Sequence, residues 1–253
     1  MDESPSFAES FDDPRITAQF CRRLPDSSGD LVLIGVVHDH PASVTRVERV
    51  LGHVEPTTLA LELPPIALPL YRVYGRTGDA DESAESTPPR FGGEMSAAIR
   101  AAPDAETVGI DAPNWSFLRR LVTRLVADRV SPATARRVLS SVGNATRDAL
   151  TYRIAATLTH ATSMTVIPGD TVEYDVDHED SPDRQAAHER AHVASIQALL
   201  GSVDTDGTTL AYRDDTRERC MIERLEEIRS EPGDAVAVVG VDHLDRLAAA
   251  LTE

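Results

Sequence analysis

The chain has 253 residues, 41% of them hydrophobic, which is enough for one large domain or two small ones. Its formal net charge is −17 and all 25 basic residues are arginines, which argues against nucleic acids and anionic membrane surfaces as partners. The apolar runs are strand-sized, and two cysteines are too few for a disulfide framework. We therefore expect a cytoplasmic protein with a halophilic composition, because dense counterions screen the self-repulsion of an acidic surface.

The apolar runs and turn residues predict alternating strands and helices. After a flexible N-terminal segment over residues 1–14, the expected elements are, in chain order, an edge strand within 15–24, a buried strand over 31–37, a helix from Ser43, a strand over 59–63, helices near 64–74 and 94–102, a strand over 107–110, helices over 115–130, 184–200 and 213–229, a strand from 235, and a helix after His243. Strands separated by helices imply right-handed crossovers and parallel pairing. The predicted fold class is α/β, with a mixed, mainly parallel central sheet and flanking helices. A single domain is expected over 15–253, with a helix-rich insertion over 113–230.

One short signature, Gly-x-x-His, occurs twice, and each copy ends a Val-rich apolar run. The two copies are Gly35–His38 and Gly240–His243. In an open α/β sheet, ligands bind at the carboxyl ends of the strands, where the glycine would let the backbone turn and leave room for a ligand. If the two strands are neighbours, His38 and His243 should meet at one site. Neutral imidazole is a common ligand for transition metals and can also act as a general base.

Two further strands are predicted to end in a carboxylate. Glu62 lies near the end of the predicted apolar strand 59–63, and Asp111 follows Val108-Gly109-Ile110. A carboxylate in such a position is costly to bury unless it is paired or binds a metal. Together with the two histidines, four strands would each deliver an ionisable side chain to one edge of the sheet.

In this order, the motifs resemble the TraB family of pheromone-shutdown proteins, which is related to the Tiki-type metalloproteases. The resemblance covers about residues 30–250 and rests on Gly35–His38 with Ser43, Ala60-Leu61-Glu62-Leu63, Gly109-Ile110-Asp111 with Arg119 or Arg120, the segment 216–222, and Gly240–His243. Two positions depart from the family pattern: Thr216 stands where the family has Glu, and Glu218 stands where it has Asp or Asn.

The resemblance implies a metal-dependent, peptidase-like hydrolase. Its divalent ion, Mn, Co or Zn, would be held by His38, His243 and Glu62 and would lower the pKa of a bound water. Glu62, Asp111 and Arg217 would be the catalytic residues, with Arg217 orienting a carboxylate or stabilising developing negative charge. The substrate would be a peptide or a small molecule. The sequence leaves open whether the chain forms a homo-oligomer.

Two other functions fit the same residues. The first is a non-catalytic regulatory or binding protein that keeps the TraB fold, which the altered segment at Thr216 and Glu218 favours. The second is metal-free ester hydrolysis, in which a His–Glu pair activates water, as in the distantly similar erythromycin esterases.

A rival motif lies in the predicted helix 184–200. His188-Glu189-Arg190-Ala191-His192 matches H-E-x-x-H, which in zinc peptidases places two imidazoles one turn apart beside a glutamate base. The flanking residues are strongly polar, and Glu218 is the only candidate for a third ligand. We therefore expect a solvated helix face, with Glu189 among basic neighbours. His40 is expected to be a turn residue that leads into the helix after it.

Overall fold

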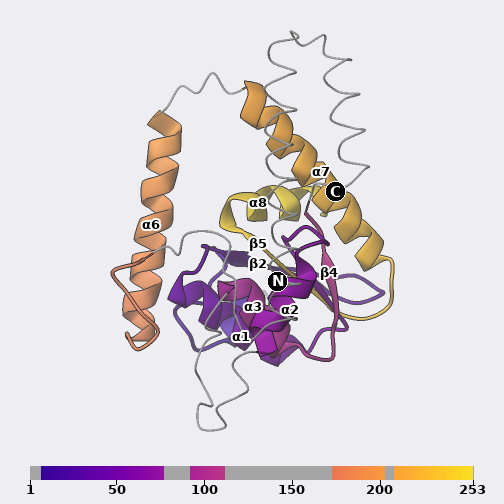
Figure 1. Ribbon diagram of the computed structural model, residues 1–253, viewed down its shortest axis with the longest axis horizontal. Helices are drawn as coiled ribbons and strands as arrows, with labels where there is room; N and C mark the ends of the chain where they lie inside the picture. Colours follow the sequence, from indigo (N-terminus) through magenta and orange to yellow (C-terminus); the bar gives the residue numbers. More distant parts are fainter. Residues whose placement is uncertain (1–6, 77–91, 112–172, 203–207, 253) are drawn as a thin grey trace, which may run out of the picture.

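A computed structural model describes residues 7–76, 92–111, 173–202 and 208–252 of the chain. Its centre is a five-stranded sheet with the order β1-β2-β5-β3-β4. The strands are β1 (Cys21–Leu24), β2 (Leu31–Val36), β3 (Thr58–Leu61), β4 (Glu106–Gly109) and β5 (Ala235–Gly240). Only β1 is antiparallel to its neighbour, and the other four strands are parallel. The predicted α/β class with a mixed, mainly parallel sheet is therefore confirmed (Figure 1).

Helices cover both faces of this sheet, as Figure 1 shows. The helices that the structure describes are the 3-10 helix η1 (Phe7–Ser10) and the α-helices α1 (Pro41–Val54), α2 (Leu68–Arg76), α3 (Gly93–Ala101), α6 (Pro182–Ser202), α7 (Thr208–Arg229) and α8 (Val241–Ala250). Of these, α6 packs against α1 at the side of the domain. The edge strand expected within 15–24 is present as β1 and pairs antiparallel with β2, with Cys21 opposite Ile34. Two of the long helices, α6 and α7, lie within the expected insertion over 113–230, whereas the helix expected over 115–130 lies outside the described residues.

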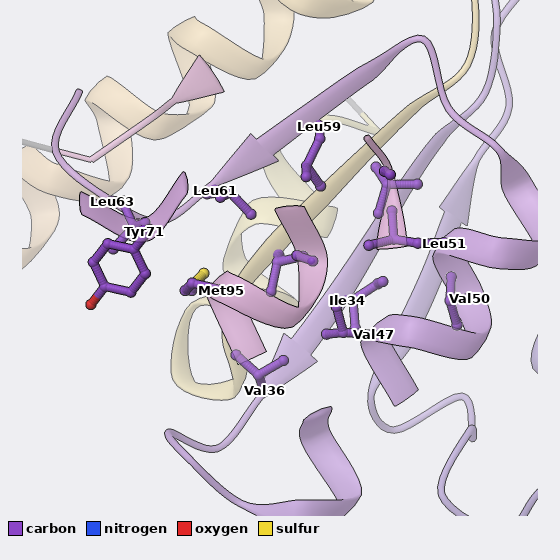
Figure 2. Close-up of a cluster of buried hydrophobic side chains, with 14 of the residues drawn as sticks. Ile34, Val36, Val47, Val50, Leu51, Leu59, Leu61, Leu63, Tyr71 and Met95 are labelled. Carbon is purple, nitrogen blue, oxygen red and sulfur yellow. The ribbon is translucent and has the colours of Figure 1, made fainter. Parts of the chain in front are cut away.

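The larger apolar core lies between the sheet and helices α1, α2 and α3 (Figure 2). Alternate residues of β2, such as Ile34 and Val36, pack there against Val47 and Leu51 of α1. The opposite face of the sheet carries a second core, to which α7 and α8 contribute. Every residue of β2 is buried, which explains why this strand reads as a continuous apolar run rather than an alternating one.

The core beneath α7 and α8 positions the polar residues of these two helices. Met221 and Leu225 of α7 and Leu244 and Leu247 of α8 are almost fully buried against the sheet. Since α8 begins directly after β5, its first turn lies at the carboxyl ends of the parallel strands. The apolar contacts of α7 therefore fix the polar residues of the same helix relative to that edge.

The N-terminal residues that the structure describes are packed rather than loose. The rings of Phe7 and Phe11 make edge contacts with His53 of α1, at centroid distances of 6.3 and 4.8 Å. Asp13 is buried and accepts hydrogen bonds from Arg15. Two aromatic rings against His53 and the ion pair of Asp13 with Arg49 of α1 attach this part of the segment expected to be flexible, 1–14, to the domain.

No helix among the described residues is long and apolar enough to cross a membrane.

Helix α6 is held to the domain by a buried ion pair. Arg46 of α1 and Glu189 of α6 are both fully buried, and the two guanidinium Nη atoms donate to the two carboxylate oxygens. Arg46 also donates to the backbone oxygens of Arg15 and Gly35, at 2.6 and 2.9 Å, and lies 4.0 Å from the ring centroid of Phe20. One guanidinium therefore connects α1, α6, β2 and the segment before β1.

Replacing Glu189 by Ala should lower the free energy of unfolding by about 3–5 kcal/mol, because it leaves the buried Arg46 charge without its partner. Denaturant unfolding followed by circular dichroism measures this loss. The matched control is Glu227→Ala in α7, whose partner Arg224 is exposed, and about 0–1 kcal/mol is expected there. Equal losses in the two variants would show that the buried pair has no special role.

Candidate functional site

Four ionisable side chains follow the four parallel strands at their carboxyl ends. In the order of the strands β2, β5, β3 and β4 they are His38, His243, Glu62 and Asp111. Val36 is paired with Gly240, so the two Gly-x-x-His segments leave the sheet side by side. Neighbouring strands lie about 4.8 Å apart, so the backbone positions of this row extend over about 14 Å.

The glycines of the two signatures allow close contacts rather than a turn. Gly35 lies inside β2, and a Cβ there would be 2.8 Å from Cδ2 of Leu244, so a side chain at this position would require the Leu244 side chain to move. A Cβ on Gly240, the last residue of β5, would be 3.4 Å from Oε2 of Glu62. The prediction that Gly35 turns the chain is therefore wrong, because this residue lies inside β2. At Gly240 a Cβ would make an ordinary contact with Glu62, and the expectation that this glycine leaves room for a ligand stays a prediction.

Glu62 is the centre of the first cluster of side chains. Its Oε2 accepts the backbone N–H of Gly240 at 2.7 Å, and its Oε1 accepts Nη2 of Arg217 at 2.9 Å. Nε2 of His243 lies 3.4 Å from the same Oε1. Burial raises the pKa of the Glu62 carboxyl above its usual range, although His243, Gly240 and Arg217 each favour the ionised form.

Arg217 joins the ends of two strands. Its Nε and Nη2 donate to the two oxygens of Asp111, both at 2.9 Å, while Nη2 also reaches Glu62. A bidentate contact between a guanidinium and a carboxylate fixes the relative orientation of the two groups as well as their distance. Arg217 thus orients the carboxylates that follow β3 and β4 at this edge.

The His243 ring is held from its other side by Glu218. Nδ1 of His243 lies 3.0 Å from Oε1 of Glu218, and Arg246 donates to both Glu218 oxygens at 3.2 and 3.1 Å. The side chains of His243 and Glu218 are only 15% and 11% exposed. Glu218 accepts the Nδ1 proton in this geometry, which leaves Nε2 directed at Glu62. Sequence reasoning noted Glu218 as a departure from the family pattern and as the only candidate for a third ligand of the H-E-x-x-H motif, and it missed this contact.

His38 has different partners. Its Nδ1 lies 3.2 Å from Oε1 of Glu94 in α3, and its Nε2 lies 3.4 Å from Oδ2 of Asp39. The hydrogen bond to Glu94 raises the pKa of His38 to about 9, against the opposing effect of burial, and the charges of Glu94 and Asp39 add to the increase. The His38 side chain is 61% exposed, whereas that of Glu94 is 2% exposed.

The three predicted metal ligands do not form one group. Among the described residues, the one set of three or more His, Cys, Asp or Glu side chains whose ligand atoms all lie within 4.8 Å is His38, Asp39 and Glu94. Glu62 and His243 are neighbours, but they belong to the other cluster. Sequence reasoning missed Glu94, since no local pattern connects a residue of α3 to the end of β2.

The two histidines nevertheless share one arrangement. Each has Nδ1 against a glutamate oxygen, at 3.2 Å for His38 and 3.0 Å for His243. Each has Nε2 at 3.4 Å from a second carboxylate. The repeated signature therefore produces repeated geometry, although the partner residues come from unrelated segments.

The H-E-x-x-H segment is not a solvated helix face. Glu189 is fully buried against Arg46 and also accepts the hydroxyl of Ser43 at 2.5 Å. Nδ1 of His188 lies 3.0 Å from Nε2 of His40, and the His188 and His192 rings are stacked. The expectation of a solvated Glu189 is wrong, because its charge is matched in the interior. This glutamate is also unavailable as the base of a zinc peptidase.

His40 is the N-cap of α1. This position agrees with the expectation of a turn residue that leads into a helix. Its Nδ1 accepts the N–H of Ala42 at 3.1 Å, so its proton resides on Nε2 and is donated to His188. The residue is fully buried, and burial lowers its pKa to about 3, with the charges of His188 and Arg46 acting in the same direction. His40 therefore stays neutral in the folded protein.

No protein-family model matches this chain, and neither the curated proteins nor the solved structures contain a match. The resemblance to the TraB family stays a prediction from the motifs.

The buried His40 predicts sensitivity to acid. The unfolded chain protonates this residue below about pH 6.5, but the folded protein does so only near pH 3. Between these values the contribution of His40 to stability is lost as pH falls, at no more than about 1.4 kcal/mol per pH unit. His40→Asn keeps a good capping side chain and should flatten this part of the stability curve. Urea unfolding of both proteins at pH 7, 5.5 and 4.5 checks this, and identical slopes would contradict it.

Proposed function

We propose that this chain is a hydrolase whose reacting groups are His243 and Glu62. One observation carries the proposal: the His243 ring is held at Nδ1 by Glu218 and directs Nε2 at the Glu62 carboxylate, 3.4 Å away. An imidazole that donates Nδ1–H to one carboxylate carries its lone pair on Nε2, and here that lone pair can remove a proton from a water hydrogen-bonded to both Nε2 and Glu62. The metal-free His–Glu mechanism is therefore the alternative that the geometry favours.

The reaction would begin with a water that hydrogen-bonds to both Nε2 of His243 and Oε1 of Glu62. His243 removes one proton as the water oxygen forms a bond to the carbonyl carbon of an ester or amide. Glu62 holds the second hydrogen and stabilises the imidazolium. When the bond from carbon to the leaving oxygen or nitrogen breaks, His243 returns its proton to that atom, and an acid and an alcohol or amine are released. Arg217 and the N–H of Gly240 keep the Glu62 carboxylate in place.

The metal-dependent version of this function has less support. One ion would need His38, His243 and Glu62 together, and these residues do not form a group of that kind. The reaction proposed above uses His243, Glu62 and water and needs no metal ion. The net charge of −17 makes a neutral or cationic substrate, a peptide or a small ester, a better candidate than an anionic polymer. A cytoplasmic, salt-rich setting remains part of the proposal.

Purified protein in concentrated potassium chloride with a chelator should hydrolyse at least one member of a panel of nitrophenyl esters and short peptides. His243→Gln should lower kcat/KM by about 10²–10⁴-fold, the usual contribution of a general base. The matched control is His192→Gln, which should keep the wild-type rate because this ring lies outside the cluster.

Three outcomes separate the alternatives. Activity that is lost in His192→Gln and in chelator would favour a zinc peptidase. Activity that the chelator abolishes, that only an added divalent ion restores, and that depends on His243 but not on His192 would favour the metal-dependent hydrolase. A folded wild-type protein that hydrolyses nothing in the panel, with or without added metal, would favour the non-catalytic regulatory protein.

The raised pKa of Glu62 sets a direction for the pH dependence. The reaction needs both an ionised Glu62 and an unprotonated His243, so kcat/KM should rise with pH, and the part of this rise that belongs to Glu62 should be displaced upward from that of an ordinary glutamate. Arg217→Gln removes a charge that lowers this pKa, and the acidic limb should therefore move to higher pH as the rate falls. Rate measurements from pH 4 to 9 test this. A limb that stays in place would show that Glu62 does not control it.

A further inference from the structure

We propose that His38, Asp39 and Glu94 form a binding site for one divalent transition-metal cation, of the Mn²⁺ class, separate from the His243–Glu62 pair. The site is independent of the proposed hydrolysis, and its ligand set differs from the one that the sequence motifs imply. The carboxylates of Asp39 and Glu94 come from the end of β2 and the start of α3 and meet at His38.

The three side chains already lie close to the geometry of a coordination shell. One ligand atom from each can be chosen so that all lie within 4.8 Å of one another. Ligands at about 2.0–2.2 Å from an ion are separated by roughly 3–4.4 Å, so small side-chain adjustments bring these atoms into range. His38 is 61% exposed and gives access from solvent, whereas Glu94 anchors the site from the interior.

The charge of this cluster is unbalanced, and that points to a cation. Within the described residues, the ion pairs of Asp39 and Glu94 are both with His38, so one imidazole faces two carboxylates. Glu94 is buried and Asp39 is 24% exposed, so water screens the two negative charges only in part. A bound divalent ion would supply the missing positive charge.

The cluster around Glu62 provides an internal comparison. Three carboxylates gather there, and they are met by three cationic or basic groups: Glu62, Asp111 and Glu218 by Arg217, Arg246 and His243. Two permanent positive charges, those of Arg217 and Arg246, therefore already lie among the three carboxylates of that cluster. Within the described residues, the ion pairs of Asp39 and Glu94 include no arginine.

The backbone shapes the space around Asp39. This residue has φ of 55°, in the left-handed region that non-glycine residues seldom adopt. A Cβ on Gly93, whose own φ is +48°, would be 1.9 Å from Oδ1 of Asp39, so only glycine fits beside this carboxylate. The Asp39 N–H donates to Oε2 of Glu94 at 2.9 Å, and the Tyr174 hydroxyl donates to the backbone oxygen of His38 at 2.6 Å. These contacts hold the ligands together before an ion arrives.

The ligand chemistry selects the class of ion. Imidazole favours transition metals over Ca²⁺ and Mg²⁺, and two carboxylates favour Mn²⁺ over the softer Cu⁺. Three protein ligands leave positions for water. We therefore expect a single site of moderate affinity, with Mn²⁺ as the probe.

Calorimetric titration of the full chain with Mn²⁺ in potassium chloride tests the proposal, with no substrate present. One ion per chain should bind, and Asp39→Asn and Glu94→Gln should each weaken binding by at least tenfold. Asn tolerates the left-handed backbone, so Asp39→Asn should keep the fold even if the buried Glu94 variant does not. Circular dichroism and thermal unfolding verify the fold of each variant. His243→Gln is the matched control and should keep the wild-type Kd.

Two results would overturn the proposal. The first is wild-type protein that binds no Mn²⁺ at millimolar concentration. The second is binding that His243→Gln weakens and Asp39→Asn does not, which would place the ion between the two Gly-x-x-His motifs. Since hydrolysis is assayed in chelator and metal binding without substrate, failure of one proposal does not imply failure of the other.

Discussion

The parallel pairing of β2 with β5 is the constraint on which the rest of the structure depends. These strands come from opposite ends of the chain, and every residue of β2 is buried. Their register sets Val36 opposite Gly240, so the segments that follow both strands leave the sheet at one edge. Helix α8 then packs back over Gly35, where a side chain would collide with Leu244. A shift of one residue in this register would reverse which side chains face each core.

Electrostatic pairing decides what the polar residues at this edge can do. Arg46 and Glu189 neutralise each other in the interior, so the glutamate of the H-E-x-x-H motif is unavailable as a catalytic base. Buried charges of this kind are tolerated because each has a hydrogen-bonded partner. The same rule explains the ordered contacts of Glu62 with Arg217. A sequence motif therefore has a chemical meaning only after the partners of its charged residues are known.

The two Gly-x-x-His motifs show how one local pattern can serve two purposes. His243 is mostly buried and lies between two glutamates, an arrangement suited to moving a proton. His38 has the same pattern of contacts but lies largely in solvent, next to Asp39. The division of labour that we propose, proton transfer at one histidine and metal binding at the other, follows from this difference in exposure and in balancing charge.

The sequence by itself determined the order and type of the main elements, the parallel sheet, and the delivery of His38, His243, Glu62 and Asp111 to one edge. These follow from hydrophobic periodicity and from the geometry of strand–helix–strand units, which are local properties. Only the tertiary structure decided which of these side chains meet. Glu94 and Glu218 lie on helices whose polar residues give no local signal of a distant partner, and the burial of Glu189 depends on an arginine in another helix. Such contacts arise from packing between remote segments, which no periodicity encodes.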